Sequence, residues 1–265
     1  YFNLIFDKSL ESAAQRIRWV SGTSEHEAAL ALHGLREGIV ALAGTGAFVH
    51  LQLPSRGIVR HLDGFGPVLG DHGGAYQIGL RAFRAAAAAH WSPRRATSLR
   101  EPVFAALNLR TVGDAIGLSL LNPDRSLLAS LARVVETEAE KGDAIARAIL
   151  LDASADLSET VYDALSAADL FDADLPLVGT GSIATRCALY WRNFCERVHA
   201  FAPNLRPLAN PRPAVLGVLA QGIMRRFDLN DPALHTLVST INRSYDAFST
   251  SQSDTKGAPC FKTST

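Results

Sequence analysis

The first clear hydrophobic pattern in the chain is that of three short β-strands. Gly38–Ala43 is a nearly continuous apolar run, Ala47–Leu53 alternates apolar and polar positions, and Ile58–Leu62 follows a turn at Pro54–Gly57. Period-two alternation is typical of a strand with one buried face, and glycine- or proline-containing turns mark the ends of such strands. The segment predicts an antiparallel meander whose first turn is Gly44-Thr45-Gly46.

Helical periodicity takes over beyond the meander. Predicted helices cover Ala75–His90, Arg125–Lys141, Asp143–Ser166, a segment from Ser182 to about Ala200, and Ala214 to about Arg226. Gly142 separates the second helix from the third, and a further strand, Pro176–Gly181, ends in glycine before the fourth. Ser182 is the expected N-cap of that fourth helix, because a serine hydroxyl satisfies the free N–H groups of a first helical turn.

The pattern fades towards both ends of the chain. Residues 1–22 are poorly patterned, although Leu10–Val20 is a candidate helix. Residues 23–227 are predicted to form one lobe, and residues 228–265 a helix-like segment followed by a tail. The Ser/Thr-rich stretch from residue 249 onward is expected to be disordered, because it has too few apolar residues to bury.

Composition narrows the class of protein. The chain has 265 residues, 48% of them hydrophobic, and can bury roughly 70 to 75% of its unfolded surface. Its 26 basic residues equal its 26 acidic ones, so charge gives no reason to expect nucleic acid or an anionic membrane as a partner. No apolar run approaches the ~20 residues that span a bilayer. A cytoplasmic protein with a small-molecule partner is expected.

The three cysteines, Cys187, Cys195 and Cys260, have neither an even count nor a CxxC spacing. This argues against a disulfide framework and against a zinc site. Because Cys187 and Cys195 fall on one face of a predicted helix, they are interpreted as packing residues.

Two glycine loops are candidate phosphate or nucleotide sites. The hairpin Gly44-Thr45-Gly46 exposes backbone N–H groups that can converge on a phosphate, with the Thr45 hydroxyl as a further donor, although an ordinary turn has the same residues. Gly179-Thr-Gly-Ser182 follows a strand and precedes a helix N-terminus, which favours an anion. The alternative for this second loop is a tight strand-to-helix connection.

Two carboxylates are candidate functional groups. Asp71 lies in Gly70-Asp-His-Gly-Gly74, where flanking glycines are expected to leave it accessible to a sugar hydroxyl, or where it caps the helix beginning at Ala75. Glu25 lies in the first turn of a predicted helix, where the dipole alone favours acidic residues. As a general base it would instead take a proton from a substrate hydroxyl.

In order and spacing these segments resemble the BadF/BadG/BcrA/BcrD ATPase family and its N-acetylglucosamine kinase branch. The resemblance covers residues 20–225 and rests on Ser-Glu-x-x-Ala-Ala-Leu, Leu-Ala-Gly-Thr-Gly, Gly-Phe-Gly-x-x-x-Gly-Asp-x-Gly-Gly-Ala-Tyr-x-Ile-Gly, Lys-Gly-Asp143 and Leu-Val-Gly-Thr-Gly-Ser. It implies an α/β fold, a ribonuclease H-like lobe of the actin-like, sugar kinase and Hsp70 fold, in which the meander is joined by parallel strands and packed with helices.

The resemblance also implies residue roles and ligands. It assigns phosphate binding to Gly44, Thr45 and Gly46, sugar contacts to Gly64, Phe65, Gly66 and Asp71, the adenosine loop to Gly179, Thr180, Gly181 and Ser182, and the position of the catalytic base to Glu25. The implied reaction is ATP-dependent phosphorylation of an amino sugar with Mg²⁺. No residue is assigned as a metal ligand, and a homodimer is a possible assembly.

Several positions depart from the family pattern. Ala47 stands where serine is usual, Phe65 where tryptophan is usual, and His72 and Gly74 replace glutamate and serine. The expected base is aspartate, and Glu25 is one methylene longer. A shift of about an ångström in a catalytic group is enough to slow a reaction.

The family's opening Asp-Gly-Gly-x-Thr phosphate loop does not occur in these residues, and the only methionine is Met224. Tyr1 is therefore not expected to be the natural start, and the chain is expected to be truncated and inactive alone. Two alternatives remain. One is a non-catalytic sugar- or nucleotide-binding remnant of the family, and the other is its iron–sulfur ATPase branch, which places a cysteine where this chain has Ala41.

Overall fold

A computed structural model describes residues 24–121, 123–227 and 231–255. The chain forms two compact units, one made of residues 37–211 and the other of the segments before residue 37 and after residue 211. The predicted helix Leu10–Val20 and Cys260 lie outside the described residues. The proposed lobe boundaries at residues 23 and 227 stay a prediction.

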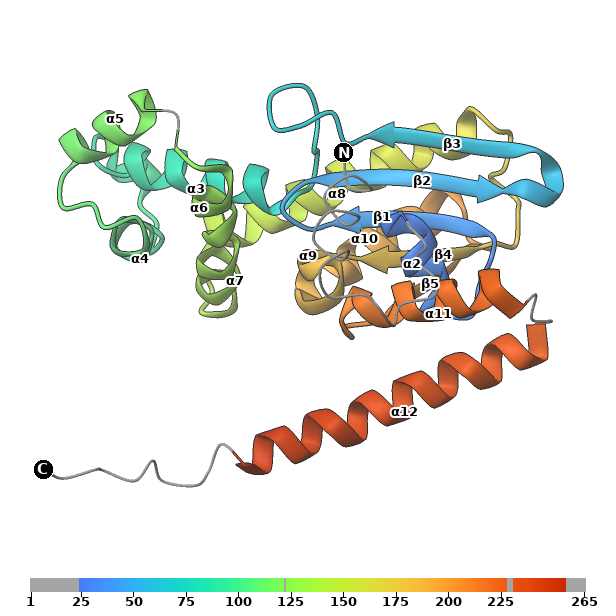
Figure 1. Cartoon of the computed structure of the whole chain (residues 1–265). Helices are drawn as coiled ribbons and strands as arrows, with labels where there is room; N and C mark the ends of the chain where they lie inside the picture. Colours follow the sequence, from blue (N-terminus) through green and yellow to red (C-terminus); the bar gives the residue numbers. More distant parts are fainter. Residues whose placement is uncertain (1–23, 122, 228–230, 256–265) are drawn as a thin grey trace, which may run out of the picture. The chain divides into compact units, whose positions relative to one another are not determined.

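The larger unit is built on one mixed five-stranded sheet of order β3-β2-β1-β4-β5 (Figure 1). Its strands are β1 (Gly38–Ala43), β2 (Ala47–Leu53), β3 (Ile58–Asp63), β4 (Pro176–Thr180) and β5 (Arg206–Ala209). The first three pair antiparallel, which confirms the predicted meander, and β1–β4 and β4–β5 pair parallel. The four-residue β5 was not predicted, because a short strand that contains proline has no readable alternation.

Alternation along the meander places one face of the sheet in the core. The cross-strand pairs Ile39–Leu51, Ala41–Val49 and Ala43–Ala47 all belong to the main hydrophobic cluster. Such pairs fix the register, because a slip of one residue would move every one of these side chains to the other face.

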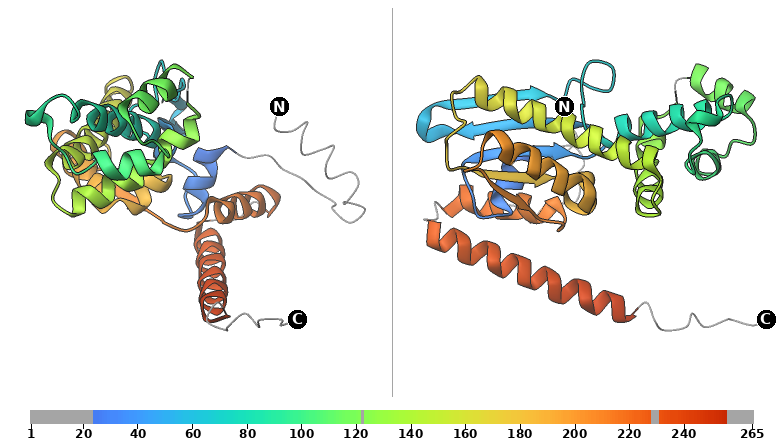
Figure 2. Two further views of the ribbon diagram at one scale, coloured as in Figure 1. Left: turned by 90° about the vertical axis from the view of Figure 1, so that its left-hand side faces the viewer. Right: turned by 180° about the vertical axis from the view of Figure 1, so that it is seen from behind.

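Helices make up the rest of this unit. They are α3 (Ala75–Ala88), α4 (Arg100–Ala106), α5 (Val112–Leu120), α6 (Arg125–Ser130), α7 (Ala132–Glu140), α8 (Ala144–Ser166), α9 (Ser182–Arg186) and α10 (Ala188–Phe201), with 3-10 turns at Pro54–Arg56 and Pro93–Arg95. Helix α8 packs across β1, β2 and β3, and α10 packs along α8 (Figure 2). The 23-residue helix α8 thereby covers one face of the meander, and α10 covers α8.

The helix ends differ from the predicted ones in three places. The predicted helix 125–141 is interrupted at Leu131, and the one after the second glycine loop is interrupted at Cys187. Ser182 is not a cap, because Gly181 occupies the N-cap position and no side chain bonds there. Asp143 does cap α8, since its carboxylate accepts the N–H of Ala146 over 2.7 Å.

The smaller unit contains α2 (Glu25–Ala31), α11 (Ala214–Phe227) and α12 (Asp231–Thr255). Helices α2 and α11 pack closely, and Glu27 of α2 is paired with Arg225 of α11 at 2.6 Å. Helix α12 continues to Thr255, so the disorder predicted from residue 249 is wrong for the first part of that stretch. The Ser/Thr-rich composition of these residues did not indicate that the helix would continue into them.

Candidate functional site

The two predicted glycine loops lie side by side at one edge of the sheet. Strands β1 and β4 are parallel neighbours, with Ala41 opposite Gly179, so both chains leave the sheet at the same edge. At Gly181, φ is 87° and ψ is 158°, a conformation essentially restricted to glycine. A Cβ on Gly181 would also lie 2.4 Å from the carbonyl oxygen of Ala43, so the two backbones touch directly.

The first of these loops is tied to helix α3. The N–H of Ala75 donates to the carbonyl of Gly44 over 2.8 Å, and the N–H of Tyr76 donates to the carbonyl of Thr45 over 3.0 Å. Two of the free N–H groups at the start of α3 are thereby satisfied by the hairpin. The hairpin has a fixed position, since the N–H of Gly44 also donates to the carbonyl of Gly46 over 2.9 Å, and Thr45 is its exposed residue.

A cavity of about 380 Å³ joins the two loops. Thr45 and Ser182 line it together with Arg133 and Glu136 of α7 and Arg186 of α9. Two arginines outnumber the one carboxylate around this hollow, and four residues with hydroxyl groups line it, a set that is suited to an anionic ligand. The sequence carried no motif for these helix residues, and only their arrangement in the fold brings them to the loops.

Asp63 organises the segment predicted to bind sugar, residues 64–71, which is called the sugar loop below. Its carboxylate accepts the N–H groups of Gly64 and Asp71, both over 2.7 Å, and that of His72 over 2.8 Å. Asp63 itself has φ of 64°, a left-handed conformation that aspartate tolerates better than most residues. The two ends of the loop are therefore held together by one side chain, which the sequence analysis did not single out.

Asp71 is not placed as predicted. It is 3% exposed, its Oδ1 accepts the N–H of Ala47 over 3.2 Å, and its Oδ2 is paired with Nη2 of Arg125. The prediction that this carboxylate is accessible is wrong. Neighbouring groups cover Asp71, although glycines flank it in the sequence. The alternative as a helix cap is also wrong, since Gly74 is the N-cap of α3.

The tip of the sugar-loop segment is exposed. Phe65 is 68% exposed, and it lines a hollow of about 410 Å³ with Leu69, His72, and Thr160 and Asp163 of α8. His72 is paired with Asp63 at 3.0 Å and its side chain is 58% exposed. This is the solvated role that a lone histidine usually has.

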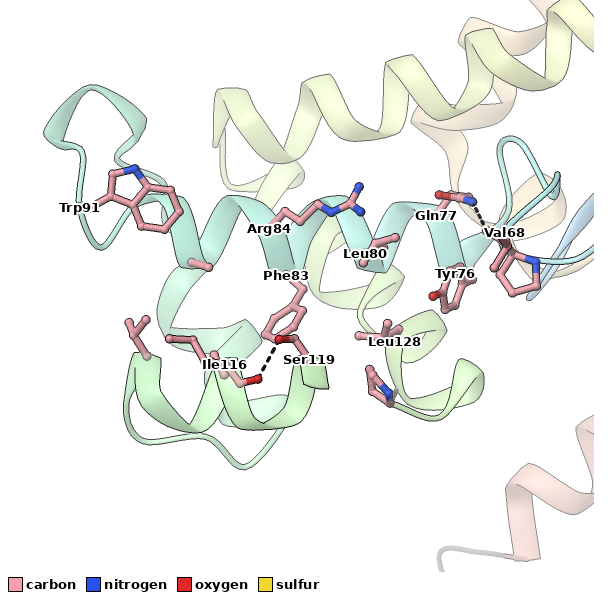
Figure 3. Close-up of a pocket in the computed structure, with 15 residues that line it drawn as sticks. Val68, Tyr76, Gln77, Leu80, Phe83, Arg84, Trp91, Ile116, Ser119 and Leu128 are labelled. Carbon is pink, nitrogen blue, oxygen red and sulfur yellow. Dashed lines mark hydrogen bonds between the residues drawn. The ribbon is translucent and has the colours of Figure 1, made fainter. Parts of the chain in front are cut away.

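Another cavity, of about 850 Å³, lies between α3, α5 and α6 (Figure 3). Tyr76, Phe83 and Leu128 point into it, and the polar group nearest the sugar loop is Gln77, whose Nε2 donates to the carbonyl of Pro67 over 2.9 Å. None of the predicted site residues lines this cavity. It is predominantly apolar and carries no grouping of catalytic side chains.

Glu25, the candidate base, belongs to the smaller unit, whereas both glycine loops and the sugar loop belong to the larger one. It is the first residue of α2 and is exposed. The cap of this helix is Ser24, which forms a reciprocal capping box with Glu27. Glu25 takes no part in that box, so the capping role falls to its neighbours.

The part of the chain that the structure describes contains neither a cluster of metal ligands nor a helix suited to crossing a membrane. Within the described ranges, no three His, Cys, Asp or Glu side chains are arranged to hold a metal ion. The helices described include none that is long and apolar enough to cross a membrane. A magnesium ion that comes bound to nucleotide phosphates needs only one or two carboxylates, and Glu136 is the carboxylate in the cavity that joins the glycine loops.

Comparison with known proteins decides the family. The sequence profile of the BadF/BadG/BcrA/BcrD ATPase family matches residues 7–198. The chain belongs to the BadF/BadG/BcrA/BcrD ATPase family. Use of ATP with a divalent metal is a property of this class of ATPases and kinases, and the resemblance read from the sequence is confirmed.

Two curated relatives are sugar kinases. The chain is 24% identical over 198 residues to N-acetylmuramic acid/N-acetylglucosamine kinase of Clostridium acetobutylicum, covering 73% of this chain and 64% of the relative. It is 31% identical over 170 residues to N-acetyl-D-glucosamine kinase of Dictyostelium discoideum, covering 63% of this chain and 53% of the relative. The chain therefore spans less than two thirds of the length of either kinase.

Solved structures show the same fold. A protein from Chromobacterium violaceum, provisionally assigned as an N-acetylglucosamine kinase, matches with a TM-score of 0.60 and 21% identity over 83% of this chain and 71% of its own. A second such protein, from Porphyromonas gingivalis, matches with a TM-score of 0.55 and 18% identity over 77% of this chain and 65% of its own. The chain thus shares its mixed α/β arrangement of sheet and helices with these two proteins.

Proposed function

We propose that this chain carries the phosphate- and sugar-binding parts of an ATP-dependent amino-sugar kinase that acts on N-acetylglucosamine or a close relative. The observation that carries the proposal is the contact between Gly181 and Ala43, which brings both glycine loops to one cavity. In the finer terms of fold, the larger unit corresponds to a ribonuclease H-like lobe of the actin-like, sugar kinase and Hsp70 architecture.

In this proposal the nucleotide lies along the two glycine loops. The hairpin Gly44-Thr45-Gly46 holds the phosphates through the N–H groups of Thr45 and Gly46 and the Thr45 hydroxyl, and the loop Gly179–Ser182 holds the adenosine. Arg133 and Arg186, which line the same cavity, offset part of the phosphate charge. Magnesium bound with the nucleotide would neutralise further charge on the transferred phosphoryl group.

The sugar is proposed to bind at the loop that follows β3. Gly64 and Gly66 allow close approach to the backbone, and the exposed ring of Phe65 offers an apolar face to a sugar ring. Asp71 has two of its roughly four acceptor sites filled by Ala47 and Arg125, which leaves acceptor capacity for a sugar hydroxyl.

Glu25 is proposed as the general base. Its carboxylate accepts the proton of the sugar hydroxyl, whose oxygen attacks the terminal phosphorus of ATP, and the bond to ADP breaks. Such a base typically contributes ~10² to 10⁴ in rate. Glutamate is one methylene longer than the aspartate expected at this position, so the carboxylate of Glu25 lies further from its backbone.

A second candidate function is a non-catalytic sugar- or nucleotide-binding protein of the same family. The burial of Asp71 and its pairing with Arg125 favour it, because a carboxylate already satisfied has less to gain from a ligand. The iron–sulfur branch receives no such support, since the chain has no cysteine before Cys187.

Calorimetric titration with Mg-ATP and with N-acetylglucosamine, followed by an assay for ADP release, separates these functions. The kinase proposal expects binding of both ligands and sugar-dependent release of ADP, which would overturn the expectation, drawn from the Asp-Gly-Gly-x-Thr loop that these residues do not contain, that this chain is inactive alone. Binding without turnover supports the non-catalytic alternative. If neither ligand binds, both proposed functions are contradicted.

A further inference from the structure

Arg125 links the sugar loop to the hairpin Gly44-Thr45-Gly46, which is called the phosphate hairpin below. It is the first residue of α6, and its Nη2 donates to Oδ2 of Asp71, 54 residues away in the sequence. No motif or resemblance drew attention to Arg125, because its partner is distant in the chain. The pairing is a product of the fold.

Three interactions hold Asp71, two at its carboxylate and one at its backbone N–H. Its Oδ1 accepts the N–H of Ala47, which follows the hairpin directly, its Oδ2 faces Arg125, and its own backbone N–H donates to Asp63 over 2.7 Å. Because Asp71 is 3% exposed, an unpaired charge there would be strongly unfavourable. Of these partners, Arg125 is the positively charged one, and it sets the charge balance of the carboxylate.

The same guanidinium packs against the phosphate hairpin. A Cβ built on Gly46 would lie 2.4 Å from Oδ1 of Asp71 and 2.5 Å from Nη2 of Arg125. Both groups therefore lie directly against the Cα of Gly46. A substitution of either side chain therefore alters the packing of both the sugar loop and the hairpin.

We propose that Arg125 is a positioning residue that fixes the Asp71 carboxylate against the phosphate hairpin and so aligns the sugar with the transferred phosphoryl group. The inference rests on the proposed kinase function for its role in catalysis. It predicts coupling between the two sites: without Arg125, sugar binds less well and is also less well aligned for transfer.

Two variants of Arg125 and one control variant test this role. Arg125→Gln removes the charge, Arg125→Lys keeps the charge but loses the planar fork, and Arg81→Gln removes a second arginine–aspartate pair. Arg81 pairs with Asp156 at 2.6 Å between α3 and α8, and it lines neither of the cavities beside the loops. Its loss reports the structural cost of breaking an ion pair in the same unit.

Steady-state kinetics with sugar and ATP varied separately give the first readout. Arg125→Gln is expected to raise the sugar KM by about tenfold and to lower kcat by a similar factor, with a smaller rise in the ATP KM that is transmitted through the hairpin. Arg125→Lys recovers part of both losses, and Arg81→Gln changes neither. A sugar KM and kcat within about twofold of wild type in Arg125→Gln would overturn the proposal.

Hydrogen exchange at the Ala47 amide gives a second readout that does not depend on turnover. Arg125→Gln is expected to speed exchange at Ala47, because the carboxylate that accepts this N–H is released, while Arg81→Gln leaves it unchanged. Unchanged exchange at Ala47 in Arg125→Gln refutes the positioning role. If the wild-type chain phosphorylates no amino sugar, the kinase function fails, and exchange at Ala47 still decides whether Arg125 positions Asp71.

Discussion

The carboxylate of Asp63 accepts the backbone N–H of Asp71 over 2.7 Å and thereby closes the loop that contains Gly64, Phe65 and Gly66. This single side chain holds both ends of the proposed sugar site. Replacing Asp63 with alanine removes the acceptor for several amides at once, so the loop is expected to lose its fixed shape.

Asp63→Ala is expected to weaken N-acetylglucosamine binding by about tenfold or more and to leave Mg-ATP binding within about twofold. Isothermal titration with each ligand measures both effects. His72→Ala is the matched control, because it removes an exposed partner of Asp63 and keeps the carboxylate. Equal losses for the two variants would mean that the ion pair, and not the capture of backbone amides, maintains the loop.

The contact between Gly181 and Ala43 gives a prediction about stability. Gly181→Ala is expected to cost about 3 kcal/mol or more, because both the backbone angles and the Ala43 carbonyl exclude a Cβ. Gly142→Ala is the control, since Gly142 has φ of 99° with no atom near its Cβ position and should cost about 1 kcal/mol. Denaturant unfolding measures both, and equal costs would show that the two loops need not touch.

The meander was predictable from the sequence because its signals are local. Alternation and the Gly44–Gly46 turn lie within a few residues of one another, as does the cap that Asp143 supplies to α8. The cavity that joins the glycine loops was not predictable, because Arg133 and Arg186 reach it from separate helices. Asp71 was assigned to an accessible position because sequence cannot show that Arg125 and Ala47 would cover it.

Asp143 makes stability depend on pH. Burial raises the pKa of Asp143, but hydrogen bonds from the Ala146 and Ser98 amides and from the Thr97 and Ser98 hydroxyls outweigh this and lower the pKa overall. As pH falls, the unfolded chain therefore takes up the proton first. The stabilisation is complete above the ordinary aspartate pKa of about 4 and is lost as pH falls through the lower folded value.

In the wild-type chain, Oδ2 of Asp143 accepts the N–H of Ser98 over 2.7 Å. Asp143→Asn replaces this carboxylate oxygen with an amide nitrogen, which cannot accept the bond, or with an amide oxygen, which is a weaker acceptor. It is expected to lower the free energy of unfolding by about 1 to 2 kcal/mol at pH 7 and to reduce the loss of stability between pH 5 and pH 2. Urea unfolding across this range is the measurement. Asp152→Asn on the exposed side of α8 is the control, and a pH profile that changes equally in both variants would contradict the role of Asp143.

Glu25 and Glu27 allow capping to be separated from catalysis. Glu27 is hydrogen-bonded to Ser24 and Arg225, so Glu27→Gln is expected to cost about 0.5 to 1 kcal/mol in stability with kcat nearly unchanged. Glu25→Gln is expected to leave stability within about 0.5 kcal/mol and to lower kcat by ~10² or more. Thermal unfolding and initial rates measured on the same samples test this division, and the reverse assignment would remove Glu25 as the base.

Direct detection of the phosphorylated sugar tests the central claim most directly. The chain is incubated with Mg-ATP and N-acetylglucosamine, and sugar phosphate and ADP are quantified together by mass spectrometry. The kinase account predicts equal amounts of both products, with formation reduced ~10² or more in Glu25→Gln. ADP without sugar phosphate, or equal product from wild type and Glu25→Gln, would contradict it.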